Sequence, residues 1–354
     1  MRPILLALMW IGLPAAAEPK PDPLPTVHIT ELPERTETND TAAFLDLVAR
    51  HPPTVHPEPD YRFKAEVYAE LAPYVRDRPG VVQVERIGTT VENRPIWAFH
   101  ITHPTAPPEQ TVLVSASIHA LEWVGAEVAT ELAVRLAESP VPGVRVTIVP
   151  LLNVDGRARV EADLRAGENR YRRSNANGVD LNRDFAVNRE AKAIWRHIIP
   201  RRYTTSPSPL SQPESRAIDA LANRERFDVA VSLHAFGGYI YYPWAGLWER
   251  PPDHQRFVEL GHVMQSGQGA RAYRVQQLSH WAFFFRGHGM ELDHLYETYG
   301  THAFLIELTR SGLSLRHPAD RKVDFRWYNP RDPQPDTDRG VGALIALVDH
   351  LAAE

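Results

Sequence analysis

Residues 111–136 read TVLVSASIHALEWVGAEVATELAVRL, and this stretch decides the fold class. It begins as an apolar run of strand length, residues 111–118, and continues as a helix with an apolar residue every four positions from 124 to 136. His119 and Glu122 lie between the two, at the carboxyl end of a strand, where open α/β sheets bind their ligands. An imidazole and a carboxylate at this spacing can share one zinc ion. The structural alternative is a histidine at a strand end and a glutamate that caps the helix.

The composition is ordinary for a globular protein long enough to bury one large core. The 354 residues are 43% hydrophobic and 23% charged, and the formal charge of -5 is not gathered into long blocks. This charge pattern gives no reason to expect a nucleic acid partner. The chain has no cysteine, so any metal site must consist of histidine and carboxylate side chains.

The first 40 residues differ from the rest of the chain. Residues 1–17 have a basic start, a short apolar segment and three alanines, which predict a signal peptide that is cleaved near Ala17. Its apolar segment of about ten residues is shorter than the about 20 that a membrane helix needs, so we expect export and no stable membrane anchor. Residues 18–40, rich in proline, threonine and glutamate, predict an extended linker, and residues 41–354 predict a single folded domain.

Strand-like and helix-like segments alternate through this domain. The alternation predicts an α/β fold, a single-domain α/β/α sandwich with a central mixed, mostly parallel sheet. Residues 157–177 and 239–300 show little periodicity, so we expect irregular structure there, and the aromatic residues of the second segment suit a pocket wall. Further apolar runs of strand length occupy residues 144–152, 227–233 and 304–308.

Two charged or ionisable side chains stand out in these apolar runs. His234 follows one of them, and with His119 and Glu122 it would give a His2Glu site with an open fourth position, the pattern of catalytic zinc. The chain has 16 histidines, so a surface or core role is the default for each of them. Glu307 interrupts another apolar run, where a carboxylate is costly unless it is paired, metal-associated or protonated. It either neutralises an arginine or serves as a general base beside a metal site.

Residues 170–185, RYRRSNANGVDLNRDF, concentrate arginines in one loop. Such a loop is either a solvated basic surface or an anion clamp, because arginine forks bind carboxylates through two hydrogen bonds. Asp180 in the same loop can accept the second N–H of a ligand histidine and so fix its tautomer.

The ordered motifs resemble those of the zinc metallocarboxypeptidases of the carboxypeptidase A/B type. The matching segments are IGTTVENRPIW at 87–97, HALEW at 119–123, NVDG at 153–156, YRR at 171–173, GVDLNRDF at 178–185, SLHAF at 232–236 and FLIEL at 304–308. The resemblance implies an enzyme that holds one zinc ion per chain and removes residues from the C-terminus of a peptide or protein.

The resemblance also implies roles for individual residues. Those that bind the metal would be His119, Glu122 and His234, with Asp180 as the hydrogen-bond partner of His119.

Four further residues would handle the substrate. The resemblance implies that Glu307 activates water and returns a proton to the leaving amine, and that Arg172 stabilises the oxyanion. Asn182 and Arg183 would bind the free C-terminal carboxylate of the substrate.

The chain departs from the digestive members of this family at three positions and in its short linker. Leu121 stands where they carry an arginine, Phe236 stands where they carry a tyrosine, and residues 283–285 contain no equivalent of their mobile tyrosine. The linker is too short to be their folded pro-domain.

We expect the segment Met290-Glu291-Leu292-Asp293 to lie on the pocket that sets substrate preference. Leu292 and Met290 favour an apolar or aromatic C-terminal residue in the substrate, whereas Glu291 would recruit lysine or arginine. Two other functions fit the same motifs, a murein-peptide amidase of the same fold and a non-catalytic peptide-binding module.

Overall fold

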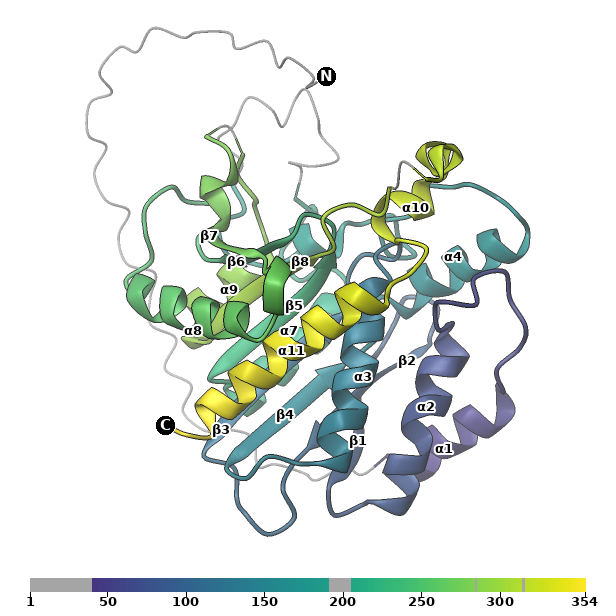
Figure 1. The fold of residues 1–354 in the computed structure, drawn as a ribbon, viewed down its shortest axis with the longest axis horizontal. Helices are drawn as coiled ribbons and strands as arrows, with labels where there is room; N and C mark the ends of the chain where they lie inside the picture. Colours follow the sequence, from purple (N-terminus) through teal and green to yellow (C-terminus); the bar gives the residue numbers. More distant parts are fainter. Residues whose placement is uncertain (1–39, 191–204, 284, 314–315) are drawn as a thin grey trace, which may run out of the picture. The chain divides into compact units, whose positions relative to one another are not determined.

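The computed structural model describes residues 40–190, 205–283, 285–313 and 316–354 (Figure 1). The expected signal peptide and residues 18–39 of the expected linker lie outside the described residues. Asp40, the last residue of the expected linker, is described and is hydrogen-bonded to the sheet. Its N–H donates to the carbonyl of Val84 at 3.0 Å, and its carboxylate accepts from the N–H of Arg86 at 2.7 Å.

One sheet of eight strands organises the described residues, in the order β1-β2-β4-β3-β5-β8-β6-β7. The inner strands β4, β3, β5 and β8 run parallel, and β6 and β7 are parallel to each other. The pairs β1–β2, β2–β4 and β6–β8 are antiparallel, so the mixed, mostly parallel sheet expected from the sequence is confirmed. The strands are β1 (Val82–Thr89), β2 (Pro95–Ile101), β3 (Gln110–Ala116), β4 (Val144–Val149), β5 (Val229–Ala235), β6 (Tyr239–Tyr242), β7 (Arg274–Gln277) and β8 (His302–Leu308).

Helices cover the sheet on both faces (Figure 1). The helices on one face are α1 (Thr41–Arg50), α2 (Lys64–Asp77), α3 (Val124–Glu138), α8 (His254–Ser266) and α11 (Gln334–Leu351). On the other face lie α7 (Pro213–Glu225) and α9 (Glu291–Tyr299). No helix among the described residues is long and apolar enough to span a bilayer.

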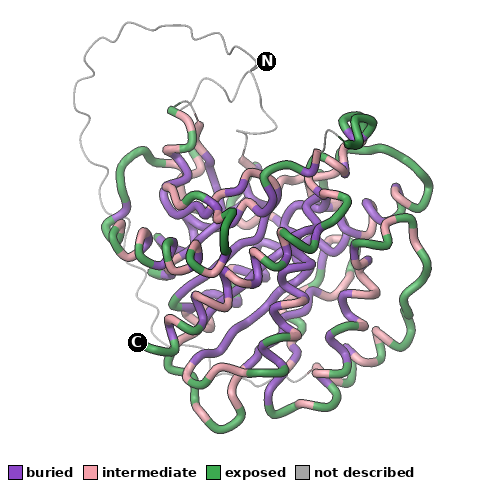
Figure 2. Tube along the Cα trace, viewed as in Figure 1, coloured by how far each residue is buried: buried purple, intermediate pink, exposed green. Residues whose placement is uncertain are grey.

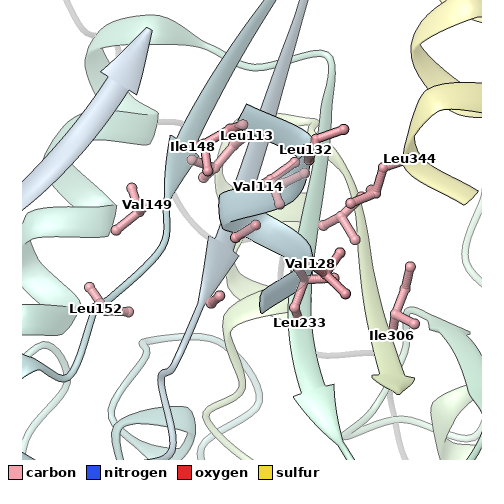
Figure 3. Close-up of a cluster of buried hydrophobic side chains, with 14 of the residues drawn as sticks. Leu113, Val114, Val128, Leu132, Ile148, Val149, Leu152, Leu233, Ile306 and Leu344 are labelled. Carbon is pink, nitrogen blue, oxygen red and sulfur yellow. The ribbon is translucent and has the colours of Figure 1, made fainter. Parts of the chain in front are cut away.

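The core lies between the inner strands and the α3–α11 layer, where the chain is almost continuously buried (Figure 2). Val128 and Leu132 of α3 point onto the strands, beside Leu344 of α11 (Figure 3). Each fully buried side chain of this size stabilises the fold by about 1.5–3 kcal/mol relative to its exposed state. A rigid support of this kind can hold strand ends in fixed positions.

Two segments expected to be irregular are partly regular. The first contains most of α4 (Val154–Arg165), whose buried face carries charged residues such as Arg157 and Glu161, so it shows no apolar periodicity. Asn153 caps this helix by accepting the N–H of Gly156 at 2.9 Å. The second segment, residues 239–300, contains β6, α8, β7 and α9, which cover about half of it, so the expectation of irregular structure was wrong for that half. Several of its aromatic residues do line a cleft, as expected.

Candidate metal centre and substrate cleft

The strand ends place His119 and His234 next to each other. Parallel strands β3 and β5 pair Ala116 with Leu233, so the loop after β3 and the end of β5 lie at the same edge of the sheet. Gly125 in the first turn of α3 allows this loop to fold tightly. A Cβ there would lie 3.0 Å from the carbonyl oxygen of Leu233 on β5, a tighter contact than most real Cβ atoms make, so the glycine lets α3 lie close to β5.

His119, Glu122 and His234 converge on one point. Nδ1 of His119 lies 2.9 Å from Oε1 of Glu122, Nδ1 of His234 lies 3.1 Å from Oε2, and the two Nδ1 atoms are 3.1 Å apart. All three residues are at most 3% exposed. Two imidazole nitrogens and a carboxylate that meet in a buried position form a donor set that suits zinc.

Electrostatics keep these groups in the forms that bind a metal. Burial alone would raise the pKa of Glu122, but the neighbouring imidazoles of His119 and His234 outweigh it and hold that pKa well below its usual range. Burial lowers the pKa of His234 to about 4, so its imidazole is neutral near pH 7 and keeps a lone pair for a ligand bond.

Asp180 fixes the orientation of His119. Nε2 of His119 lies 3.1 Å from Oδ1 of Asp180, and an ionised carboxylate can only accept, so Nε2 carries the proton and Nδ1 faces Glu122. Burial would raise the pKa of Asp180, but the positive charge of Arg173 outweighs it and holds that pKa well below its usual range.

A chain of hydrogen bonds through Ser232 and Glu291 orients His234, and the sequence patterns did not reveal it. Nε2 of His234 lies 3.2 Å from the hydroxyl of Ser232, which donates at 2.6 Å to Oε2 of Glu291. The hydroxyl of Ser115 donates to Oε1 of the same carboxylate at 3.0 Å. Glu291 is only 2% exposed and is engaged by two serines, so its position does not favour the recruitment of a basic substrate side chain.

Glu307 lies on β8, the strand next to the one that carries His234. The β5–β8 register pairs His234 with Glu307, and the carboxylate lines the same cleft. Its Oε2 is buried and has no hydrogen-bond partner among the residues that the structure describes. Burial, reinforced by the negative charge of Glu122, raises the pKa of Glu307 well above its usual range, and Arg173 offsets this in part. Glu307 thus lines the cleft and forms no ion pair with any residue that the structure describes.

The two neighbouring arginines of the loop are oriented differently. Arg172 binds Asp163 through both Nε and Nη2, the second bond at 3.0 Å. Arg173 donates from Nη1 to Glu122 at 3.3 Å and from Nε to Asp180 at 2.8 Å. Arg172 was expected at the reacting carbonyl, but the structure places the guanidinium of Arg173, not that of Arg172, beside Glu122.

Asn182 and Arg183 lie together in the same cleft, which has a volume of about 1360 Å³. Both are buried, and Oδ1 of Asn182 accepts the N–H of Glu291 at 2.9 Å. Nη1 of Arg183 donates to the carbonyl of Asn182 at 2.6 Å. The pair is therefore held in a fixed orientation at the cleft wall.

Leu292, expected to contact substrate, is 1% exposed and lies outside the cleft lining. Its neighbour Met290 does line the cleft, because the chain enters α9 between them and turns Leu292 into the core. The apolar lining of the cleft includes Leu278, Trp281, Phe285, Met290 and Leu305.

The sequence of the chain matches the model of a known protein family. The model of the zinc carboxypeptidase family matches residues 67–322, more than half of the chain. The chain belongs to the zinc carboxypeptidase family. The resemblance seen in the motifs is thereby confirmed, and the cleft occupies the matched region except for its wall beyond residue 322.

Curated metallocarboxypeptidases that match the chain include distant relatives. Carboxypeptidase A2 of Mus musculus is 26% identical over 271 residues, which are 71% of this chain and 63% of that protein. The inactive metallocarboxypeptidase ECM14 of Saccharomyces cerevisiae is 24% identical over 280 residues, 72% of this chain and 64% of that protein. The chain thus spans less than two thirds of the length of these curated relatives. The structure of carboxypeptidase A from Helicoverpa armigera has a TM-score of 0.65 at 22% identity, and the match covers 88% of this chain and 79% of that one.

Proposed function

We propose that this zinc carboxypeptidase family member is a catalytically active, zinc-dependent carboxypeptidase that hydrolyses the C-terminal peptide bond of peptides. The observation that carries the proposal is the convergence of three groups on one cleft. These are the buried His119, Glu122 and His234, the unpaired Oε2 of Glu307 one strand away, and the Arg183 guanidinium.

Each group has a place in the reaction. His119, Glu122 and His234 would hold one zinc ion, which when bound polarises a carbonyl and lowers the pKa of water. Glu307 takes the proton from the attacking water and later gives it to the leaving amine.

Two further groups handle the substrate. Asn182 and Arg183 bind the C-terminal carboxylate of the substrate, which brings the scissile bond within reach of the proposed metal ligands. Arg173, rather than Arg172, stabilises the oxyanion, because it already lies beside Glu122.

The cleft wall favours an apolar or aromatic C-terminal residue in the substrate. The residues between 278 and 290 that line the cleft are Leu278, Trp281, Phe285 and Met290, all of them aromatic or aliphatic. Glu291, the acidic residue that could recruit a basic substrate side chain, is buried and accepts a hydrogen bond from Ser232. We further propose export of the protein, on the basis of residues 1–17.

A peptide library digested by the purified protein and read by mass spectrometry tests this function. We expect single residues, mainly apolar or aromatic, to be released from free C-termini, and we expect a zinc chelator to abolish release and added zinc to restore it. Release from D- or γ-linked cell-wall peptides alone would identify a murein-peptide amidase. Peptide binding without any release would identify a non-catalytic module, as the name of the inactive yeast relative allows.

The chain from His234 through Ser232 to Glu291 positions the third ligand. Because Ser232 donates its own hydrogen to Glu291, the serine oxygen can accept a hydrogen bond from the N–H at Nε2 of His234, which leaves Nδ1 for zinc. We expect Ser232→Ala and Glu291→Gln to weaken zinc binding by about 10- to 100-fold in a chelator competition.

Ser115→Ala is the matched control, because Ser115 contacts the same carboxylate, and Ser232 at 3.3 Å, but has no hydrogen bond to His234 in the described residues. It should retain nearly the wild-type zinc affinity, and Ser232→Thr, which keeps the hydroxyl, should recover most of the loss. Equal losses in Ser115→Ala and Ser232→Ala would show that the serines act only through packing.

A further inference from the structure

The loop at residues 117–123, which carries His119 and Glu122, connects β3 to α3 without regular structure and is buried throughout. Its backbone N–H and C=O groups therefore need partners from elsewhere, because a buried backbone group is costly when it is left unpaired. Side chains supply some of these partners. The carbonyl of Ile118, for example, accepts a hydrogen bond from Nδ2 of Asn153 at 3.3 Å.

Asn329 binds the peptide groups on both sides of Glu122. Its Oδ1 accepts the N–H of Trp123 at 2.9 Å, and its Nδ2 donates to the carbonyl of Leu121 at 2.7 Å. These two groups belong to the two peptide planes that meet at the Cα of Glu122, and the rotation of those planes is the only soft freedom of the backbone there. One side-chain amide thus fixes the direction in which Glu122 leaves the backbone.

The amide of Asn329 is itself held in place. Its Nδ2 also donates to the carbonyl of Phe325 at 2.9 Å, on the short helix α10 (Asp324–Tyr328), whose last residue lines the cleft. The next residue, Pro330, accepts the hydroxyl of Tyr61 at 2.8 Å. Asn329 is fully buried, and its oxygen and both of its amide hydrogens have partners, so the amide has one orientation.

The three groups of the metal site need such external support. In the forms that bind zinc, Nδ1 of His119, Nδ1 of His234 and the carboxylate of Glu122 all present lone pairs, yet these atoms lie 2.9–3.1 Å apart. Lone pairs at this distance repel one another unless a cation lies between them. The surrounding structure must therefore oppose their separation, and for Glu122 it acts through the backbone.

We propose that Asn329 is a positioning residue for zinc, which holds Glu122 ready to bind the ion through the two peptide groups beside it. A ligand that is already oriented loses less conformational freedom when the metal binds, so the affinity is higher. The inference rests on the proposed function, because that function makes Glu122 a zinc ligand.

Competition with a chromogenic chelator measures the zinc affinity of the wild type and of two variants. Asn329→Ala removes both hydrogen bonds, whereas Asn329→Asp keeps the shape and the bond from Trp123 but places an oxygen against the carbonyl of Leu121. We expect both variants to bind zinc about 10- to 100-fold more weakly, the usual effect of losing a group that orients a metal ligand. If Asn329→Ala does not fold, Asn329→Asp decides the question.

The visible absorption spectrum of cobalt, bound in place of zinc, gives a second measurement. It reports the geometry of the ligands, so it should differ from that of the wild type in Asn329→Asp. A residue that only stabilises the fold would leave this spectrum unchanged, and an unchanged spectrum would overturn the inference.

Gln268→Ala is the matched control, because Gln268 is also a buried side-chain amide that binds the backbone. Its Oε1 accepts the N–H of Tyr273 at 2.6 Å, and it lies outside the cleft lining. The control should lower the melting temperature but keep the wild-type zinc affinity and cobalt spectrum. Wild-type zinc affinity in the Asn329 variants, or an equal loss of affinity in Gln268→Ala, would overturn the positioning role of Asn329.

The same titrations separate this inference from the proposed function. A wild-type protein that binds zinc but cleaves no peptide would contradict the proposed activity, and the zinc affinities of the Asn329 variants would still decide the inference. Normal cleavage by the wild type with unchanged zinc affinity in those variants would overturn the inference alone. A wild-type protein that binds no zinc would overturn both.

Discussion

Replacing Glu307 with glutamine is expected to leave zinc bound while turnover falls by at least about 10²–10⁴-fold, the usual contribution of general acid–base catalysis. Glutamine keeps the size of the side chain but cannot take a proton from water. Glu307 lies on β8 opposite His234, and the groups that bind the metal are His119, Glu122 and His234, so the ligands are not altered. The measurements are kcat on a C-terminal peptide and zinc content after dialysis.

The matched control for this prediction is Glu161→Gln, a largely buried glutamate on α4 that lies outside the cleft lining. It should retain wild-type turnover per folded molecule. Near-wild-type turnover in Glu307→Gln would show that another group takes the proton. Loss of zinc from that variant would show instead that Glu307 supports the ligands.

The metal motif and the fold class were predictable because they depend on local patterns. An apolar strand followed by HALEW and an amphipathic helix specifies β3, a ligand-bearing turn and α3. The strand that carries His234 near its carboxyl end follows the same rule, and parallel pairing then brings both strand ends to one edge of the sheet. The confirmed family match agrees with these patterns.

The remaining parts of the cleft depend on contacts that spacing does not encode. Tyr328 enters the site because Asn329 binds the backbone at Leu121 and Trp123, more than 200 positions earlier in the chain. Leu292 turned inward because α9 begins at Glu291, and sequence patterns locate helix starts only to within a few residues. Aligned motifs indicate which residues are near a site, whereas the fold determines which of them face it.

For Arg172 and Arg173 too, the sequence shows that both are near the site but not which of them faces it. In an irregular loop the side chains of neighbouring residues point in different directions, so the motif YRR does not reveal which arginine faces the metal. Arg173→Ala is expected to lower kcat by about 10²–10³-fold, because it removes the donor beside the position where negative charge develops. Arg172→Ala is expected to change kcat less than tenfold, because its guanidinium is bound to Asp163.

The pair is its own control, since both substitutions remove one arginine from the same loop. Kinetics on one peptide, with zinc content for each variant, separate oxyanion stabilisation from support of Asp180, which Arg173 also binds. Arg173→Lys keeps the charge but loses the planar fork, so it should recover only part of the rate. A large loss of kcat in Arg172→Ala with Arg173→Ala near wild type would reverse the assignment, and would require Arg172 to leave Asp163 when substrate binds. Loss of zinc in Arg173→Ala would mean that its contacts with Glu122 and Asp180 maintain the metal ligands rather than the transition state.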